Sequence, residues 1–102
     1  MGVGIIANMQ AKLLLKSREP LGDDRFVERV VWQVPAPVAG SAHGFRYRLA
    51  FVVAGQCVVR YDNEAGKGDH RHLGERELPY RFSTLQELLG DFWRDVDDWR
   101  SE

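Results

Sequence analysis

The stretch "FRYRLAFVVAGQCVVRY" (residues 45–61) decides which fold this sequence predicts. Large apolar side chains alternate with other residues over its first nine positions, as in a half-buried β-strand. "AGQ" (54–56) is typical of a tight turn, and "CVVRY" (57–61) returns as the partner strand of a hairpin. The apolar face comprises Phe45, Tyr47, Leu49, Phe51 and Val53, and Arg46 and Arg48 lie on the opposite face.

The residues before this hairpin indicate two more strands. "RFVERVVWQV" (25–34) is rich in the β-branched and aromatic residues that favour strands. "AKLLLKS" (11–17) fits a strand or a short helix, and we favour the strand because strands follow it. Within 25–34, the side chains expected to face the core are Phe26, Val30, Trp32 and Val34.

Turns, loops and a final short strand complete the sheet. "LGDD" (21–24) predicts a turn, and "PAPVAGSAHG" (35–44) predicts a loop in which His43 lies at the surface. "RELPYRF" (76–82) predicts a short strand at an edge of the sheet, or one that begins after Pro79, because proline donates no backbone hydrogen bond. Such an edge could pair with a second copy of the chain and form a homodimer.

The C-terminal residues predict an amphipathic helix over 83–100. A capping box, either Ser83 with Gln86 or Thr84 with Glu87, marks its start. Apolar residues then recur at helical spacing, so one side of the helix would cover one face of the sheet. This apolar stripe consists of Leu85, Leu88, Leu89, Phe92, Trp93, Val96 and Trp99.

These elements predict an α+β fold, in which an antiparallel meander of about four or five strands is covered by one C-terminal amphipathic helix. The 102 residues fit a single domain (1–102), with mainly strands over 11–82 and helix over 83–100. Residues 1–10 carry no clear pattern, so we expect a disordered or non-native start there. Cys57 is the only cysteine; it allows no intrachain disulfide and is expected in the core.

The charges are distributed unevenly, although the net charge is only −1. Residues 1–82 carry 12 basic and 9 acidic side chains, whereas residues 83–102 carry 2 basic and 6 acidic ones. A mildly basic body is compatible with binding an anion. No segment approaches the roughly 20 apolar residues that span a bilayer, and the first residues make a poor signal peptide. We therefore expect a cytoplasmic protein that does not contact a membrane.

The stretch "YDNEAGKGDHRH" (61–72) is expected to form an irregular loop dense in titrating groups. Ordinary turn chemistry is one explanation, with Asp62 and Asn63 capping a turn. The paired His70 and His72 favour acid–base chemistry instead, because RNA cleavage needs one group to take the 2′-hydroxyl proton and another to protonate the leaving oxygen. If residues 70 and 72 are extended, both imidazoles share one face.

Residues around the histidines suit a phosphate. Cations offset the charge of a phosphorane-like transition state, and glycines let backbone amides approach a phosphate closely. The candidate cations are Lys67, Arg71, Arg60, Arg46 and Arg48. Asn63, Gly66 and Gly68 would shape the loop, and Asp62 or Asp69 would orient an imidazole.

A metal site is an alternative use of the same residues. His-x-His with Asp62 or Asp69 could bind a divalent metal through nitrogen and oxygen ligands. A His-x-His pair without further clear ligands is nonspecific, so we expect no metal and no other cofactor.

Three segments, "RYDNEAGKGDHRH" (60–72), "PYRF" (79–82) and "LLGDFWRDV" (88–96), together resemble the TumE-like toxins of bacterial and archaeal toxin–antitoxin pairs. The resemblance extends over roughly residues 11–100. It implies a growth-inhibiting toxin that a helix-turn-helix antitoxin of the TumA type neutralises, with RNA as the usual target of such small toxins. The residues that match the motif are Asp62, Asn63, Lys67, Asp69, His70, Arg71 and His72.

The resemblance and the loop chemistry together predict a toxin that is a small, metal-independent ribonuclease. His70 and His72 would share the general-base and general-acid duties. One alternative is a non-enzymatic binding protein that acts through the 61–72 loop. Another is a metal-dependent nuclease that uses His70 and His72.

Overall fold

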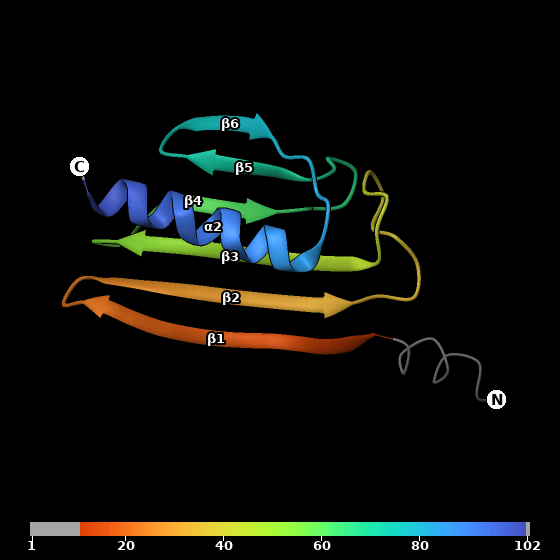
Figure 1. Cartoon of the computed structure of the whole chain (residues 1–102), viewed down its shortest axis with the longest axis horizontal. Coiled ribbons are helices and arrows are strands. Elements are labelled where there is room, and N and C mark those ends of the chain that lie inside the picture. Colours follow the sequence, from red (N-terminus) through yellow and green to blue (C-terminus); the bar gives the residue numbers. More distant parts are fainter. Residues whose placement is uncertain (1–10, 102) are drawn as a thin grey trace.

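A six-stranded antiparallel sheet covered by one helix makes up the computed structural model, which describes residues 11–101. The strands pair in sequence order, and the helix lies across the middle of the sheet, over β3 and β4 (Figure 1). The elements are β1 (Lys12–Gly22), β2 (Arg25–Gln33), β3 (Phe45–Val53), β4 (Gln56–Asp62), β5 (His70–Leu73), β6 (Arg76–Pro79) and α2 (Leu85–Arg100). The predicted α+β meander with a C-terminal helix is confirmed, and the expectation for residues 1–10 lies outside the described residues.

Strand β5 makes the sheet larger than the four or five strands predicted. Residues 70–72, expected in an irregular loop, belong to this strand and pair with β4 on one side and β6 on the other. The loop is therefore limited to residues 63–69. "HRHL" is too short and too polar for its alternation to indicate a strand, so pairing with distant segments decides its conformation.

The core lies between α2 and one face of the sheet. β3 presents its predicted apolar face to this core, and Tyr47, Leu49 and Phe51 are buried. The apolar stripe of α2 packs against them, with Leu88 and Phe92 fully buried. For the residues that the structure describes, no helix is long and apolar enough to cross a membrane.

The prediction of which β2 residues face the core is wrong. Val27 and Val31, not the opposite parity, are fully buried against α2. Both parities of β2 carry apolar residues, so its pattern alone is ambiguous. The register with β3 decides, because it places Val27 opposite Phe51 and Val31 opposite Tyr47 on the core face.

Several boundaries also differ from the predictions. β1 continues to Gly22, so the turn before β2 is limited to Asp23 and Asp24. β6 is an edge strand as predicted, but it ends at Pro79 instead of beginning after it. Cys57 is exposed, not in the core, because it pairs with Val52 close to the end of the hairpin.

The start of α2 distinguishes the two predicted capping boxes. Thr84 is the N-cap, and its Oγ1 accepts a hydrogen bond from the backbone N of Glu87 at 3.0 Å. This bond satisfies one of the free amides in the first turn of the helix. The helix therefore begins at Leu85, one residue after the second of the two candidate caps.

Candidate functional site

Three adjacent strands place arginines, histidines and an aspartate on the face of the sheet opposite α2, which we call the open face. The register puts Arg48 opposite Asp62, Asp62 opposite His70, and Arg60 opposite His72. Directly opposed residues in an antiparallel pair share a face and have close Cβ atoms. The two predicted catalytic histidines are therefore next to Asp62 and two of the predicted phosphate-binding arginines.

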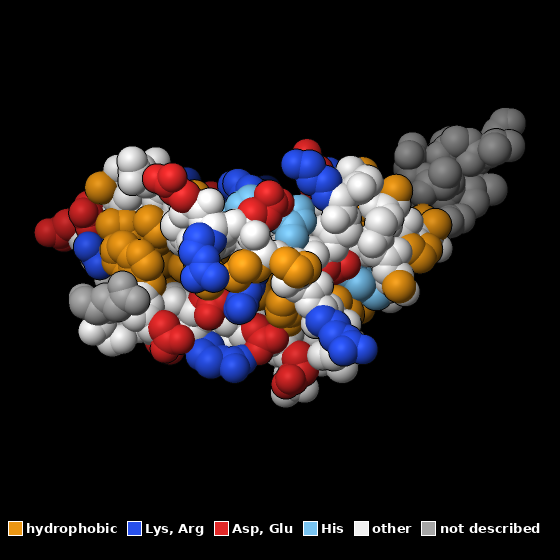
Figure 2. Space-filling view, turned by 90° about the horizontal axis from the view of Figure 1, so that it is seen from above, with side chains coloured by type: hydrophobic (Ala, Val, Ile, Leu, Met, Phe, Trp, Pro, Cys, Tyr) orange, Lys and Arg blue, Asp and Glu red, His pale blue; other side chains and the backbone are white. Residues whose placement is uncertain are grey.

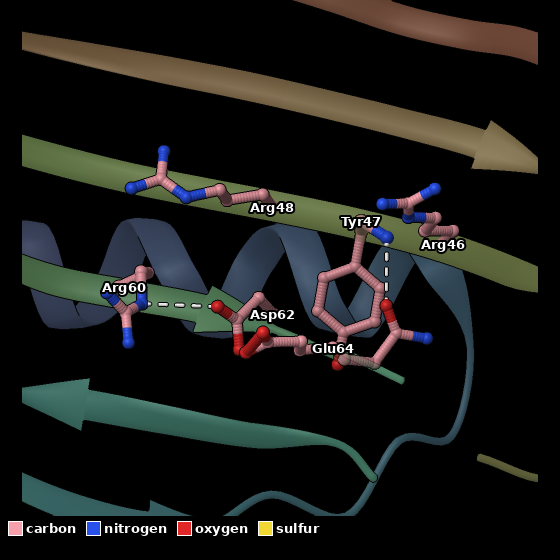
Figure 3. A pocket seen from close by; sticks show the side chains of 7 residues that line it. Arg46, Tyr47, Arg48, Arg60, Asp62 and Glu64 are labelled. Carbon is pink, nitrogen blue, oxygen red and sulfur yellow. Dashed lines mark hydrogen bonds and ion pairs between the residues drawn. The ribbon is translucent and has the colours of Figure 1, made fainter. Parts of the chain in front are cut away.

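A cavity of about 350 Å³ on the open face is lined by Arg60 and Asp62, which contact the histidines, although neither histidine lines it. Figure 3 views this face with α2 behind the sheet, and shows arginines of β3 and β4 around Asp62. Figure 2, which views the molecule from its β6 side, shows histidine side chains among acidic and basic ones. The cavity is lined by Arg46, Tyr47, Arg48, Arg60, Asp62, Asn63 and Glu64.

His70 is buried, and both of its ring nitrogens have polar neighbours. Nδ1 lies 3.0 Å from the carbonyl oxygen of Gly68, so this nitrogen must donate a proton. Nε2 lies 2.7 Å from Oδ1 of Asp62. This is a close ion-pair contact, but the Nε2–H direction is not aligned with Oδ1, so the two atoms form no hydrogen bond in this geometry.

His72 has the opposite hydrogen-bonding role. Its Nε2 lies 2.8 Å from Nη2 of Arg60, and a guanidinium can only donate. Nε2 of His72 is therefore an acceptor in a neutral imidazole. Burial and the positive charge of Arg60 lower the pKa of His72, which maintains this neutral form.

The two histidine rings lie side by side and have different polar partners. Their centroids are 5.0 Å apart, and the side chains of His70 and His72 are 7% and 23% exposed. Glu77 of β6 faces both, with Oε2 at 3.5 Å from Nε2 of His70 and 3.6 Å from Nε2 of His72. An imidazole next to a carboxylate, beside a second imidazole whose Nε2 can accept a proton, is an arrangement that acid–base catalysis can use.

The same residues could hold a metal ion. Asp62, His70 and His72 each offer a ligand atom, and these atoms lie within 4.8 Å of one another. Oδ1 of Asp62 and Nε of Arg60 are buried, and neither has an aligned hydrogen bond in the described part of the chain. Two imidazoles and a carboxylate suit zinc and similar metals. However, the Arg60 guanidinium contacts Nε2 of His72 and would have to move away from an incoming cation.

Asp69 belongs to a second cluster and does not orient either of the paired histidines. Its Oδ1 accepts a hydrogen bond from Ser41 Oγ at 2.7 Å, and its Oδ2 accepts one from Tyr47 Oη at 2.6 Å. Nε2 of His43 lies 2.7 Å from the same Oδ2. Burial alone would raise the pKa of Asp69, but the hydrogen bonds from these three side chains outweigh it and lower the pKa.

His43 is the residue that the sequence analysis missed. It was predicted at the surface, but its side chain is only 14% exposed. Its ring stacks on Phe82 with centroids 3.7 Å apart, in addition to its contact with Asp69. No motif around His43 signals this, because both partners come from distant parts of the sequence.

Asn63 fixes the loop in which the motif begins. Its Oδ1 accepts a hydrogen bond from the backbone N of Tyr47 at 3.0 Å. Its Nδ2 donates to the carbonyl oxygen of Phe45 at 2.7 Å and to Ser41 Oγ at 3.2 Å. The side chain is 1% exposed, so Asn63 connects loop 63–69 to the start of β3.

The loop glycines approach another loop instead of an open anion site. A Cβ on Gly68 would lie 2.9 Å from the carbonyl oxygen of Gly40, so a side chain does not fit between the two loops. The amide of Gly66 donates to the carbonyl oxygen of Ala39 at 2.7 Å and is not free for a phosphate. Both glycines have positive φ.

Two of the predicted cations lie away from the histidines. Nη1 of Arg71 points to the core side of the sheet, where it lies 3.1 Å from Tyr61 Oη and 3.0 Å from Asp95 Oδ2 of α2. Lys67 is exposed in the loop and does not line the cavity. Among the predicted phosphate ligands, the structure brings Arg46, Arg48 and Arg60 to the cavity.

Comparison with known proteins identifies a family. The family model described as Toxin TumE matches residues 10–100, which include every strand, the helix and both polar clusters. No curated protein matches the chain, and no solved structure matches it.

Proposed function

The chain belongs to the TumE toxin family, and we propose that it inhibits growth by cleaving RNA without a metal ion. As a member of this family, it is the toxin component of a toxin–antitoxin system and has an antitoxin partner. We further propose that the antitoxin is a helix-turn-helix protein of the TumA type and that the toxin acts in the cytoplasm. One observation carries the ribonuclease proposal: His72, whose Nε2 accepts from Arg60, lies beside His70, whose Nε2 is 2.7 Å from the carboxylate of Asp62.

In this mechanism His72 is the general base. Its Nε2 takes the proton of a ribose 2′-hydroxyl, and the 2′-oxygen attacks the adjacent phosphorus. Arg60, which contacts this nitrogen, turns toward the phosphate when the substrate binds. Arg46 and Arg48 line the same cavity and offset the charge on the phosphate oxygens in the transition state.

His70 is the general acid. The bond between phosphorus and the 5′-oxygen breaks as Nε2 of His70 donates its proton to that oxygen. Asp62 stabilises the imidazolium before the transfer, because its Oδ1 lies 2.7 Å from Nε2. The products are a 2′,3′-cyclic phosphate and a free 5′-hydroxyl, and His72 has gained the proton that His70 has lost.

The experiment is an RNA cleavage assay with purified toxin in EDTA, with a labelled RNA and a copy that carries one 2′-deoxy substitution. We expect the wild-type protein to cleave the all-ribose RNA but not the bond that follows the 2′-deoxy position. The cleavage rate should fall about 10²- to 10⁴-fold in His72→Ala and in His70→Ala. Asp97→Asn, an exposed position on α2 and therefore on the other side of the sheet from the site, is the control and retains activity. Intact RNA at every toxin concentration would contradict the proposal and favour the non-enzymatic binding protein that acts through residues 61–72.

A metal-dependent nuclease is the second candidate function. The buried Oδ1 of Asp62 without an aligned hydrogen bond, close to two imidazoles, favours it. This candidate predicts that EDTA abolishes cleavage and that Zn²⁺ or Mn²⁺ restores it. Isothermal titration with these metals, using Asp62→Asn as the matched variant, measures binding independently of activity.

A further inference from the structure

Trp32 lies at the surface of the open face, beside the arginines of the candidate site. Its side chain projects from β2 and the residue is 37% exposed. The register places Trp32 opposite Arg46 and Val30 opposite Arg48. These residues line a second shallow cavity of about 310 Å³, which shares Arg46 and Arg48 with the first cavity. The two cavities are therefore neighbours on one continuous surface.

The ring of Trp32 differs from the other two tryptophan rings. Trp93 contacts Phe92 and the guanidinium of Arg29, and Trp99 contacts Phe51 and that of Arg25. Over residues 11–101, the structure gives Trp32 no such aromatic or cation–π partner. A partly exposed aromatic ring bordered by arginines is a feature that proteins use to bind single-stranded nucleic acid, because each base can stack on the ring and each phosphate carries a charge.

We infer that Trp32 stacks on a base of single-stranded RNA whose phosphates lie along Arg46 and Arg48 toward His72. The inference rests on the proposed cleavage of RNA and adds which form of RNA the open face accepts. A base inside a duplex is already stacked on both sides, so only an unpaired base can cover the Trp32 ring.

The geometry also places the stacked base relative to the cleaved bond. Trp32 is on β2 and His72 is on β5, three strand spacings or about 14 Å apart across the sheet. The register aligns His72 with Arg60, Ala50 and Glu28, so Trp32 is also four residues, or about 13 Å, further along the strands, and the two residues are roughly 19 Å apart. This distance is longer than one nucleoside. Trp32 therefore contacts a nucleotide beyond the one next to the cleaved bond, and Arg46 and Arg48 of β3 lie between Trp32 and His72.

The test measures binding of an oligonucleotide that the toxin cannot cleave. The probe is a fluorescein-labelled single strand of 2′-O-methyl RNA, whose blocked 2′-oxygen cannot attack, and its affinity is read by anisotropy. We expect Trp32→Ala to weaken binding about 5- to 150-fold, whereas Trp32→Phe, which retains an aromatic ring, stays within about 3-fold. Arg46→Gln and Arg48→Gln should each lower the slope of log affinity against log salt by about 0.7. Arg94→Gln removes a cation from an exposed position on α2 and is the matched control. It should leave the affinity and the salt dependence unchanged.

Two kinds of result would overturn the inference, and a duplex of the same labelled strand serves as the second probe. The first is an equal affinity, either of Trp32→Ala and the wild-type protein for the single strand, or of the wild-type protein for the single strand and for the duplex. The second is a wild-type protein that binds neither probe while Trp32→Ala weakens its complex with the antitoxin, which would make this face a protein-docking surface. Because the probe cannot be cleaved, binding remains measurable even if the toxin does not cleave RNA, so the two proposals can fail separately.

Discussion

Nε2 of His43 lies 2.7 Å from Oδ2 of Asp69, across 26 positions of sequence. The His43 ring also stacks on Phe82, which precedes α2. One imidazole thus joins the loop before β3, the residue before β5 and the segment that leads into the helix. Asp69 directly precedes His70, so this cluster fixes the start of the strand that carries both candidate catalytic histidines.

Asp69 should contribute stability that depends on pH. Its pKa in the folded protein is lowered, so its contribution is present above the unfolded value of about 3.9 and is lost as the pH falls through the folded value. We expect Asp69→Asn to reduce the free energy of unfolding at pH 7 by about 1–3 kcal/mol. The difference from the wild-type protein should shrink progressively below about pH 4.

Urea denaturation at a series of pH values measures this effect. Asp97→Asn, an exposed position on α2, is the control and should change stability little at any pH. A loss of stability in Asp69→Asn that stays constant from pH 7 to pH 3 would contradict the role of the ionised carboxylate.

The charge of Arg60 should control the titration of His72. Burial and Arg60 together lower the pKa of His72, so Arg60→Gln is expected to raise it while leaving it below the ordinary value, since the burial remains. Arg60→Lys keeps a positive charge and should retain more of the lowering. NMR titration of the His72 ring protons in the three proteins measures this order, and an unchanged pKa in Arg60→Gln would argue against it.

Gly40 should tolerate substitution less well than Gly66. Both have φ near +90°, at +95° and +89°, so alanine strains the backbone at either position. Only at Gly40 would a new Cβ also lie 2.6 Å from the backbone N of Gly68. We expect Gly66→Ala to destabilise by about 1–2 kcal/mol and Gly40→Ala by clearly more, as measured by thermal denaturation. Equal losses would show that the two loops do not pack this closely.

The helix cap gives a prediction with a neighbouring control. Thr84→Ala removes the bond to the backbone N of Glu87 and should destabilise the protein by about 1 kcal/mol. Ser83→Ala, one residue earlier and also exposed, should remain within about 0.5 kcal/mol of the wild-type protein. Denaturant unfolding of both variants measures the difference, and the reverse order would place the cap at Ser83.

Local periodicity was enough to predict the architecture. The alternation over 45–53 and the helical spacing over 85–99 each specify one apolar face, and two such faces can be buried only against each other. The motif at 61–72 likewise predicted Asp62, His70 and His72 as candidate site residues, because residue type and spacing can be read from the sequence. Their catalytic roles remain predictions.

Pairing between distant segments decided what periodicity could not. β5 is a strand because β4 and β6 border it, and the core face of β2 follows from its register with β3. Arg71 binds Asp95 of α2, while His43 reaches Asp69 and leaves Asp62 as the partner of His70. The sequence alone determined which groups this protein possesses and most of the elements that carry them, with β5 as the exception. Only the tertiary structure decided which groups meet, because each contact depends on the register and approach of segments far apart in the chain.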